Sequence, residues 1–172
     1  GASTYIEIRG CYIYEAKDVC TGGRGYGVFI GNHATNCLVE DNIFRRLRHS
    51  MIAYAGANRN VFGFNFSGER HAEDRPFGSC SDMSEWEADL LFHGRFPYAN
   101  LTEGNRVDFI NGAVVHGING HYNTIFRNKI VSNSTIASEG GIRIDAYGTF
   151  DELCQYFNIY GKKNFKVYNN NN

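Results

Sequence analysis

Two histidines of this chain lie in matching segments, each made of two apolar residues, the histidine and a glycine. The segments are Leu91-Phe-His93-Gly94 and Val114-Val-His116-Gly117, and each histidine is followed seven residues later by an asparagine. An imidazole changes its charge near neutral pH, and it can take a proton or hold a cation. The pair is therefore a candidate catalytic or cation-binding site.

The spacing of the two histidines predicts how they are positioned. They are 23 residues apart, so in a coil of that length they would stack one strand apart, at about 4.8 Å. Tyr54 and Ile30 would occupy the same column below them, and Ile144 a place above. The apolar Ile30 and Ile144 favour an inward face, where both rings would fill the core and bond to the backbone. A catalytic pair and a structural pair are both compatible with the sequence.

A repeat supports this coil length. Segments with an Asn at each end recur as Asn60–Asn65, Asn100–Asn105 and Asn123–Asn128, and Cys37–Asn42 keeps the second Asn. The second Asn falls at Asn42, Asn65, Asn105, Asn128 and Asn169, with gaps of 23, 40, 23 and 41 residues. Self-similarity at such a period is the signature of a solenoid. We expect these five Asn to form one column, because Asn tolerates left-handed backbone and its amide can bond the next coil.

The segments between the Asn residues are typical of β-strands. They are short, rich in β-branched and aromatic residues and bounded by Gly or Asn, and no long stretch has a helical period. We predict an all-β fold, a right-handed parallel β-helix of about six coils, either whole or a segment of a longer helix. Residues 1–172 would form one domain with insertions at about 14–26, 67–88 and 145–163. The alternative is a β-sandwich with Asn-rich loops.

Composition narrows the function classes. The 172 residues carry a net charge of −1, which gives no indication of nucleic-acid binding. No run is long and apolar enough to span a membrane. The five cysteines contain no Cys-x-x-Cys pair, so zinc spacing is absent, and a Cys20–Cys80 disulfide is one option. The chain begins at Gly1 without Met, which we interpret as a mature product or a piece of a longer chain.

The repeated Asn-x-(Leu/Val/Ile)…Asn-x-(Ile/Val/Phe) pattern resembles the right-handed parallel β-helix repeat of the pectate-lyase-like superfamily. The resemblance covers nearly the whole chain and is specific for the fold. The superfamily contains lyases, hydrolases, epimerases, phage tailspikes and adhesins, so the fold alone does not select a function.

The resemblance implies where lyase chemistry would be located. Lyases of this superfamily use Arg or Lys as the base and Ca²⁺ held by acids to neutralise a uronate. Arg143 is the candidate base, beside His93 and His116, and the candidate Ca²⁺ ligands are Asp89, Asp108 and Asp145. The acids are scattered through the repeats, which argues against a hydrolase with two paired carboxylates. If the protein is an enzyme, the sequence therefore favours a polysaccharide lyase.

Other residues could contact a sugar chain. Arg48 belongs to a basic corner with Arg45, Arg46 and His49, and Trp86, Tyr98 and Tyr122 could stack on sugar rings. The alternatives are a solvated charged corner and aromatic residues that only pack.

Two functions follow as hypotheses. The first is an extracellular protein, secreted or at the cell surface, that binds or cleaves an acidic polysaccharide, with Ca²⁺ as an optional cofactor. The second is a non-catalytic structural or adhesive module that assembles end to end into a fibre. Neither terminus of the sequence contains a capping segment, so we expect self-association or additional chain at the ends.

Overall fold

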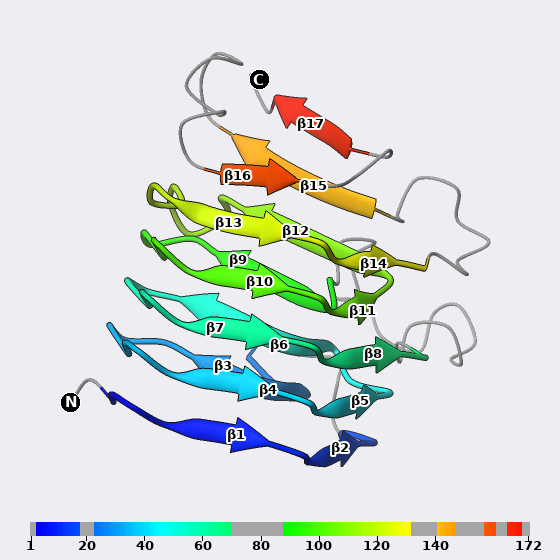
Figure 1. Cartoon of the computed structure of the whole chain (residues 1–172). Coiled ribbons are helices and arrows are strands. Elements are labelled where there is room, and N and C mark those ends of the chain that lie inside the picture. The colour runs from blue at the N-terminus through cyan, green and yellow to red at the C-terminus, as the bar shows by residue number, and fades with distance from the viewer. Residues whose placement is uncertain are drawn as a thin grey trace.

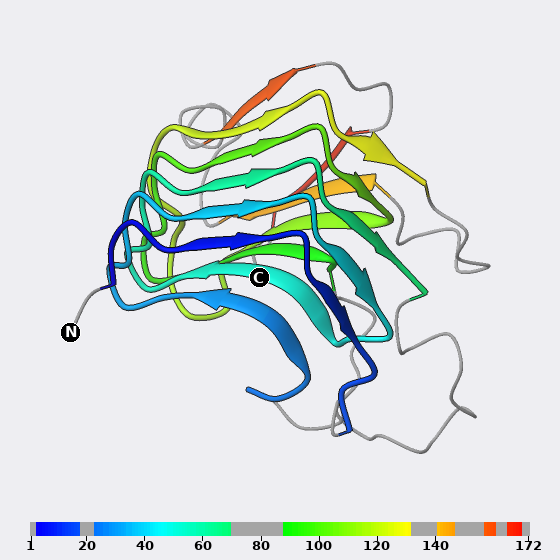
Figure 2. The ribbon, with the colours of Figure 1, turned by 60° about the horizontal axis from the view of Figure 1, so that its bottom comes forward.

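The structure is a computed structural model that describes residues 3–17, 23–69, 88–131, 141–146, 157–160 and 165–169. These residues form strands and connecting turns without any helix, and the strands build a right-handed parallel β-helix. Each coil contributes one strand to each of three parallel sheets, and successive coils lie on top of one another (Figures 1 and 2). The predicted fold class is confirmed.

The three sheets run along the axis of the solenoid. The first contains β1 (Glu7–Arg9), β4 (Leu38–Glu40), β7 (Val61–Gly63), β10 (Leu101–Glu103), β13 (Asn123–Phe126) and β16 (Phe157–Tyr160). The second contains β2 (Tyr12–Tyr14), β5 (Ile43–Arg45), β8 (Phe66–Gly68), β11 (Arg106–Val107) and β14 (Lys129–Ile130). The third contains β3 (Tyr26–Ile30), β6 (His49–Tyr54), β9 (Leu90–His93), β12 (Phe109–Ala113), β15 (Gly141–Ala146) and β17 (Phe165–Asn169). The described residues thus make five complete coils and two strands of a sixth.

The core lies inside the coils, because alternate residues of each strand point inward. Val39 and Phe62 of the first sheet, Phe44 of the second, and Leu90 and Ile110 of the third are fully or almost fully buried in one cluster. A smaller buried cluster, made by Ile52, Ala88, Leu91, Phe109 and Ala113, is separate from this core. In β6, β9 and β12 its members alternate with core residues, so it lies on the outer face of the third sheet.

Two asparagine ladders connect the coils at the two ends of the first-sheet strands. In the ladder Asn42–Asn65–Asn105–Asn128, the backbone N–H and the side-chain Nδ2 of each member donate to Oδ1 of the next, at 2.9–3.0 Å. A second ladder, Asn60–Asn100–Asn123, repeats this pattern at the other end of the strands. Cys11 and Cys37 end the ladders at the N-terminal side, where their backbone N–H groups donate to the first Asn and their thiols bond to carbonyls outside the ladder.

The left-handed residue at each ladder corner is the one before the Asn, which corrects our expectation. Asp41, Phe64, Gly104 and Arg127 have φ between 52° and 65°, and each precedes a ladder Asn. The Asn is therefore selected by its side-chain bonds and not by its backbone conformation. The preceding position accepts Asp, Phe, Gly or Arg because a single left-handed residue costs little compared with the bonds gained.

The C-terminal part of the repeat differs from the prediction. Asn169 lies in β17 of the third sheet, opposite Ala146, so its assignment to the ladder column was wrong. The strand that continues the first sheet is β16, inside the predicted insertion 145–163, because Ile159 can pack over Ile125 and extend the core. The insertion predicted at 67–88 begins later, since Ser67 and Gly68 belong to β8.

Several predictions fall on other parts of the chain. Residues 70–87, 132–140 and 147–156, together with Trp86, Cys20 and Cys80, lie outside the described residues. Within the described residues, no helix is long and apolar enough to cross a membrane.

Candidate functional site

The register of the third sheet places His93 differently from the prediction. His93 pairs with Tyr54 on one side, as expected, but with Ala113 on the other, so His116 is not its strand partner. Phe92 and Gly112 pair at a separation of 20 residues, whereas Leu101 and Thr124 of the first sheet pair at 23. The turn that follows β12 is therefore three residues longer than the turn that follows β9. Paired residues of neighbouring coils are therefore 23 residues apart in the first sheet, which carries the Asn ladders, but 20 residues apart between β9 and β12.

The histidine column faces outward, not inward. Ile30 pairs with Ala53, one position before Tyr54, and Ile144 pairs with Gly112. Ile30 and Ile144 belong to the core cluster, and alternate residues of a strand point to opposite faces. Tyr54 and His93 therefore lie on the outer face of the third sheet, and the interpretation of His93 as a core residue was wrong.

His116 nevertheless returns to His93 through the longer turn. The two imidazole rings have centroids 4.6 Å apart and meet edge to face at 80°. Asn119 donates its Nδ2 to the carbonyl of Ala113 at 3.2 Å, which folds the turn back on the end of β12. The backbone N–H of Phe96 in the preceding coil donates to the carbonyl of Ile118 at 2.8 Å, which holds the turn against that coil. It also packs closely on Gly94, where a Cβ would lie 2.9 Å from the carbonyl oxygen of Gly117. The absence of a side chain at Gly94 thus allows His116 to reach His93.

The imidazole pair ends a continuous row of rings along the solenoid. The ring centroids of Tyr26 and Phe29 are 6.1 Å apart, those of Phe29 and Tyr54 5.6 Å, and those of Tyr54 and His93 5.5 Å. Tyr54 also contacts His116, at 6.2 Å. Phe29 is 46% exposed, His116 is exposed, and the other three are half-buried. We call these five residues the ring row; it spans four coils of the outer face.

The surroundings of His93 favour its neutral form. Burial lowers the pKa of His93 to about 4, with further contributions from His116 and from the positive charge of Arg48. A neutral imidazole with so low a pKa is a weak base near neutral pH. Arg48, which we predicted to contact substrate, thus lies close enough to act electrostatically on the row.

Arg143 and Asp145 lie on the same outer face, on β15, two strands from β9 in the sheet order. Arg143 donates Nε to Oδ1 of Asp145, and both side chains are buried. Burial raises the pKa of Asp145, and the charge of Arg143 opposes that shift. This pairing occupies Arg143, the predicted base, with a carboxylate of its own strand.

The predicted Ca²⁺ ligands do not converge. Asp89 is buried, and its carboxylate accepts bonds from the Ser67 hydroxyl at 2.7 Å and from the backbone N–H groups of Asp108 and Phe109 at 2.8 and 2.9 Å. It therefore stabilises the bend between the second and third sheets. Within the described ranges, no three His, Cys, Asp or Glu side chains gather in a group that could hold a metal ion.

The predicted sugar-stacking tyrosines belong to a different region. Tyr98 contacts Phe96, at 6.0 Å between centroids, and Tyr122 contacts His121, at 5.9 Å. These four residues lie in the turns that lead from the third sheet to the first. Sequence reasoning missed Phe29, because we placed Ile30 in the column of Tyr54, whereas Ile30 pairs with Ala53 one position earlier. Its signal was the segment Tyr26-Gly-Val-Phe29-Ile30, in which Val28 and Ile30 form the inward pair.

No model of a known protein family matches the sequence, and no curated protein and no solved structure matches it either.

Proposed function

We propose that this chain belongs to the pectate-lyase-like superfamily and binds an acidic polysaccharide along the outer face of its third sheet. The observation that carries the proposal is the ring row, in which half-exposed aromatic and imidazole rings of four successive coils lie side by side. A linear polysaccharide is an extended ligand, and a row along a rigid strand array offers it several rings in register. Rings with an apolar face and a polar edge suit sugars, which present both kinds of surface.

The charges near the row support an anionic ligand. The positive charge of Arg48 acts on His93, and the nearby carboxylate of Asp145 is paired with Arg143. His93 and His116 add nitrogens that can donate or accept hydrogen bonds with hydroxyl and carboxylate oxygens. An acidic sugar therefore fits these groups better than a neutral one.

Binding is better supported than cleavage. Lyase chemistry needs a base that can take a proton from the sugar ring. Arg143 is buried and paired with Asp145, and the low pKa of His93 makes it a weak base. We therefore propose recognition of the polysaccharide as the primary function.

The test measures binding of the intact chain to polygalacturonate and to alginate, with and without Ca²⁺, by affinity electrophoresis and calorimetry. Replacing one ring, in His116→Ala or Phe29→Ala, should cost roughly 1 kcal/mol, about fivefold in affinity. His33→Ala and Tyr14→Ala are matched controls, because both residues are exposed and neither ring contacts the row. Equal affinity of all four variants, or equal binding of neutral dextran, would contradict the proposal. Ultraviolet absorbance of unsaturated uronate products in the same samples reports any cleavage.

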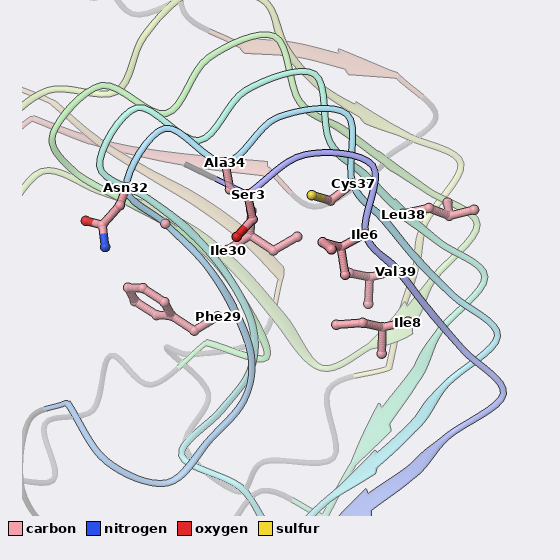
Figure 3. Close-up of a pocket in the computed structure, with 11 residues that line it drawn as sticks. Ser3, Ile6, Ile8, Phe29, Ile30, Asn32, Ala34, Cys37, Leu38 and Val39 are labelled. Carbon is pink, nitrogen blue, oxygen red and sulfur yellow. The ribbon is translucent and has the colours of Figure 1, made fainter. Parts of the chain in front are cut away.

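A cavity supports a second candidate function, end-to-end assembly of copies of this chain. The cavity has a volume of about 260 Å³ and lies at the N-terminal coil, lined by Ile6 and Ile8 on one side and Phe29 and Ile30 on the other (Figure 3). In the described chain, β1 and β16 are the edge strands of the first sheet, so a second copy stacked head to tail would continue that sheet.

Sedimentation over a range of concentrations tests the assembly. Wild type should associate, and Ile6→Lys should weaken association because Ile6 lines the cavity and is 49% exposed. Ile43→Lys is the matched control, since Ile43 is 45% exposed on the outer face of the second sheet. A monomer at every concentration would refute this candidate.

A further inference from the structure

The two imidazoles of the ring row have no hydrogen-bond partner. Among the residues that the structure describes, neither His93 nor His116 makes a hydrogen bond or an ion pair, and Nδ1 of His93 is buried without a partner. His49 shows the contrast, because its Nδ1 bonds the carbonyl of Ala88 at 2.8 Å. A buried polar atom without a hydrogen-bond partner destabilises the fold. The unpaired Nδ1 of His93, beside the imidazole of His116 that also makes no hydrogen bond, therefore suggests that a ligand binds here.

The two rings are held differently: the His93 ring is fixed in the sheet, whereas the His116 ring is exposed in a turn. His93 is fixed on β9 between two paired strands and against the ring of Tyr54. His116 is exposed in the turn after β12, which is anchored at Asn119 and Gly94. The His116 ring can therefore rotate about its side-chain bonds and direct a nitrogen to a point that His93 also reaches.

We propose that His93 and His116 together bind one divalent transition-metal ion, of the kind represented by Zn²⁺ or Ni²⁺. Neutral imidazole nitrogen is a preferred ligand of these ions, whereas Ca²⁺ prefers oxygen. Metal–nitrogen bonds of about 2.0–2.1 Å would bring the two rings to one ion after a small rotation. The protein supplies two ligands, and the other coordination positions are open to water or to an oxygen of a bound molecule. The site does not depend on polysaccharide binding.

Calorimetry with ZnCl₂ and with NiCl₂, in a buffer that does not bind metals, tests the site on the full chain. Wild type should bind one ion that both His116→Ala and His93→Gln weaken at least tenfold, while CaCl₂ gives no such binding. His33→Ala and His121→Ala are matched controls that should bind as wild type does. The five cysteines are the same in every variant, so the difference between variants isolates the imidazoles.

Nuclear magnetic resonance adds a readout that a purely structural role would not move. Paramagnetic Ni²⁺ should broaden the ring signals of Tyr54 first, since Tyr54 lies 5.5 and 6.2 Å from the two imidazoles. The broadening should disappear in His116→Ala, whose fold is checked by an unchanged circular dichroism spectrum. Equal affinity of wild type and His116→Ala, or no binding by wild type up to about 1 mM ion, would overturn the proposal.

Discussion

Replacing Asn105 with leucine tests whether the ladder holds the coils together. The side chain of Asn105 accepts two bonds from Asn65, at 2.9 and 3.0 Å, and its Nδ2 donates to the carbonyl of Phe62, to Thr102 and to Asn128 at 2.8–2.9 Å. Because Nδ2 has two hydrogens, these contacts amount to four full bonds. At about 1 kcal/mol for each buried bond, Asn105→Leu should lower the free energy of unfolding by roughly 3–4 kcal/mol.

The end of the same ladder supplies the matched control. Asn42 accepts one bond, from the backbone of Cys11, and donates to the carbonyl of Ile8 and to Asn65. Two of these three bonds are only partly buried, so Asn42→Leu should cost about 1–2 kcal/mol. Urea unfolding followed by circular dichroism gives both values by linear extrapolation. Equal losses at Asn105 and Asn42, or a loss below about 1 kcal/mol at Asn105, would refute the additive account of the ladder.

Three further predictions concern the outer face and the bend beneath it. Gly94→Ala should separate the rings of His93 and His116 and lower the free energy of unfolding more than Gly10→Ala does. Both glycines have positive φ, but only a Cβ at Gly94 would meet backbone, at 2.9 Å. Denaturant unfolding and nuclear Overhauser effects between the two rings measure these changes, and equal losses of stability in the two variants would contradict the prediction. The pKa of His93 is lowered from 6.5 to about 4, so the unfolded state binds more protons in that interval. In metal-free buffer, stability should therefore fall as pH drops from about 6.5 to 4, by on the order of 1–2 kcal/mol after allowance for partial exposure; a His93→Gln chain with the same pH profile would contradict the assignment. Asp89→Ala should cost about 3 kcal/mol, since two buried N–H groups lose their acceptor, and Asp89→Asn less than half as much because one oxygen remains; a similar loss in both variants would show that the charge itself is required.

The sequence determined the fold and the ladder because both depend on local repetition. A Gly- and Asn-bounded strand pattern that recurs every 23 residues has few compact solutions, and a buried Asn needs the same partner in each coil. Asn42, Asn65, Asn105 and Asn128 therefore form the predicted column. Asn169 does not belong to this column, because similarity to the repeat does not determine which sheet a C-terminal strand joins. The first sheet is continued by β16, whose Ile159 extends the core.

The position of the histidines was decided only by the tertiary structure. The turn after β12 is three residues longer than the turn after β9, and the segment before β12 is correspondingly three residues shorter than a 23-residue offset would require. The Asn ladders keep their 23-residue spacing, while β12 is shifted by three positions against β9. A shift by an odd number of residues reverses which side chains face the core. The shift places Ala113, and not His116, opposite His93, and His116 reaches His93 from a turn over Gly94. His93 itself faces outward because it pairs with Tyr54, whereas the core residue Ile30 pairs with Ala53. Spacing alone cannot distinguish these arrangements, because the link lengths compensate each other and only the pairing of whole strands determines which face a residue occupies.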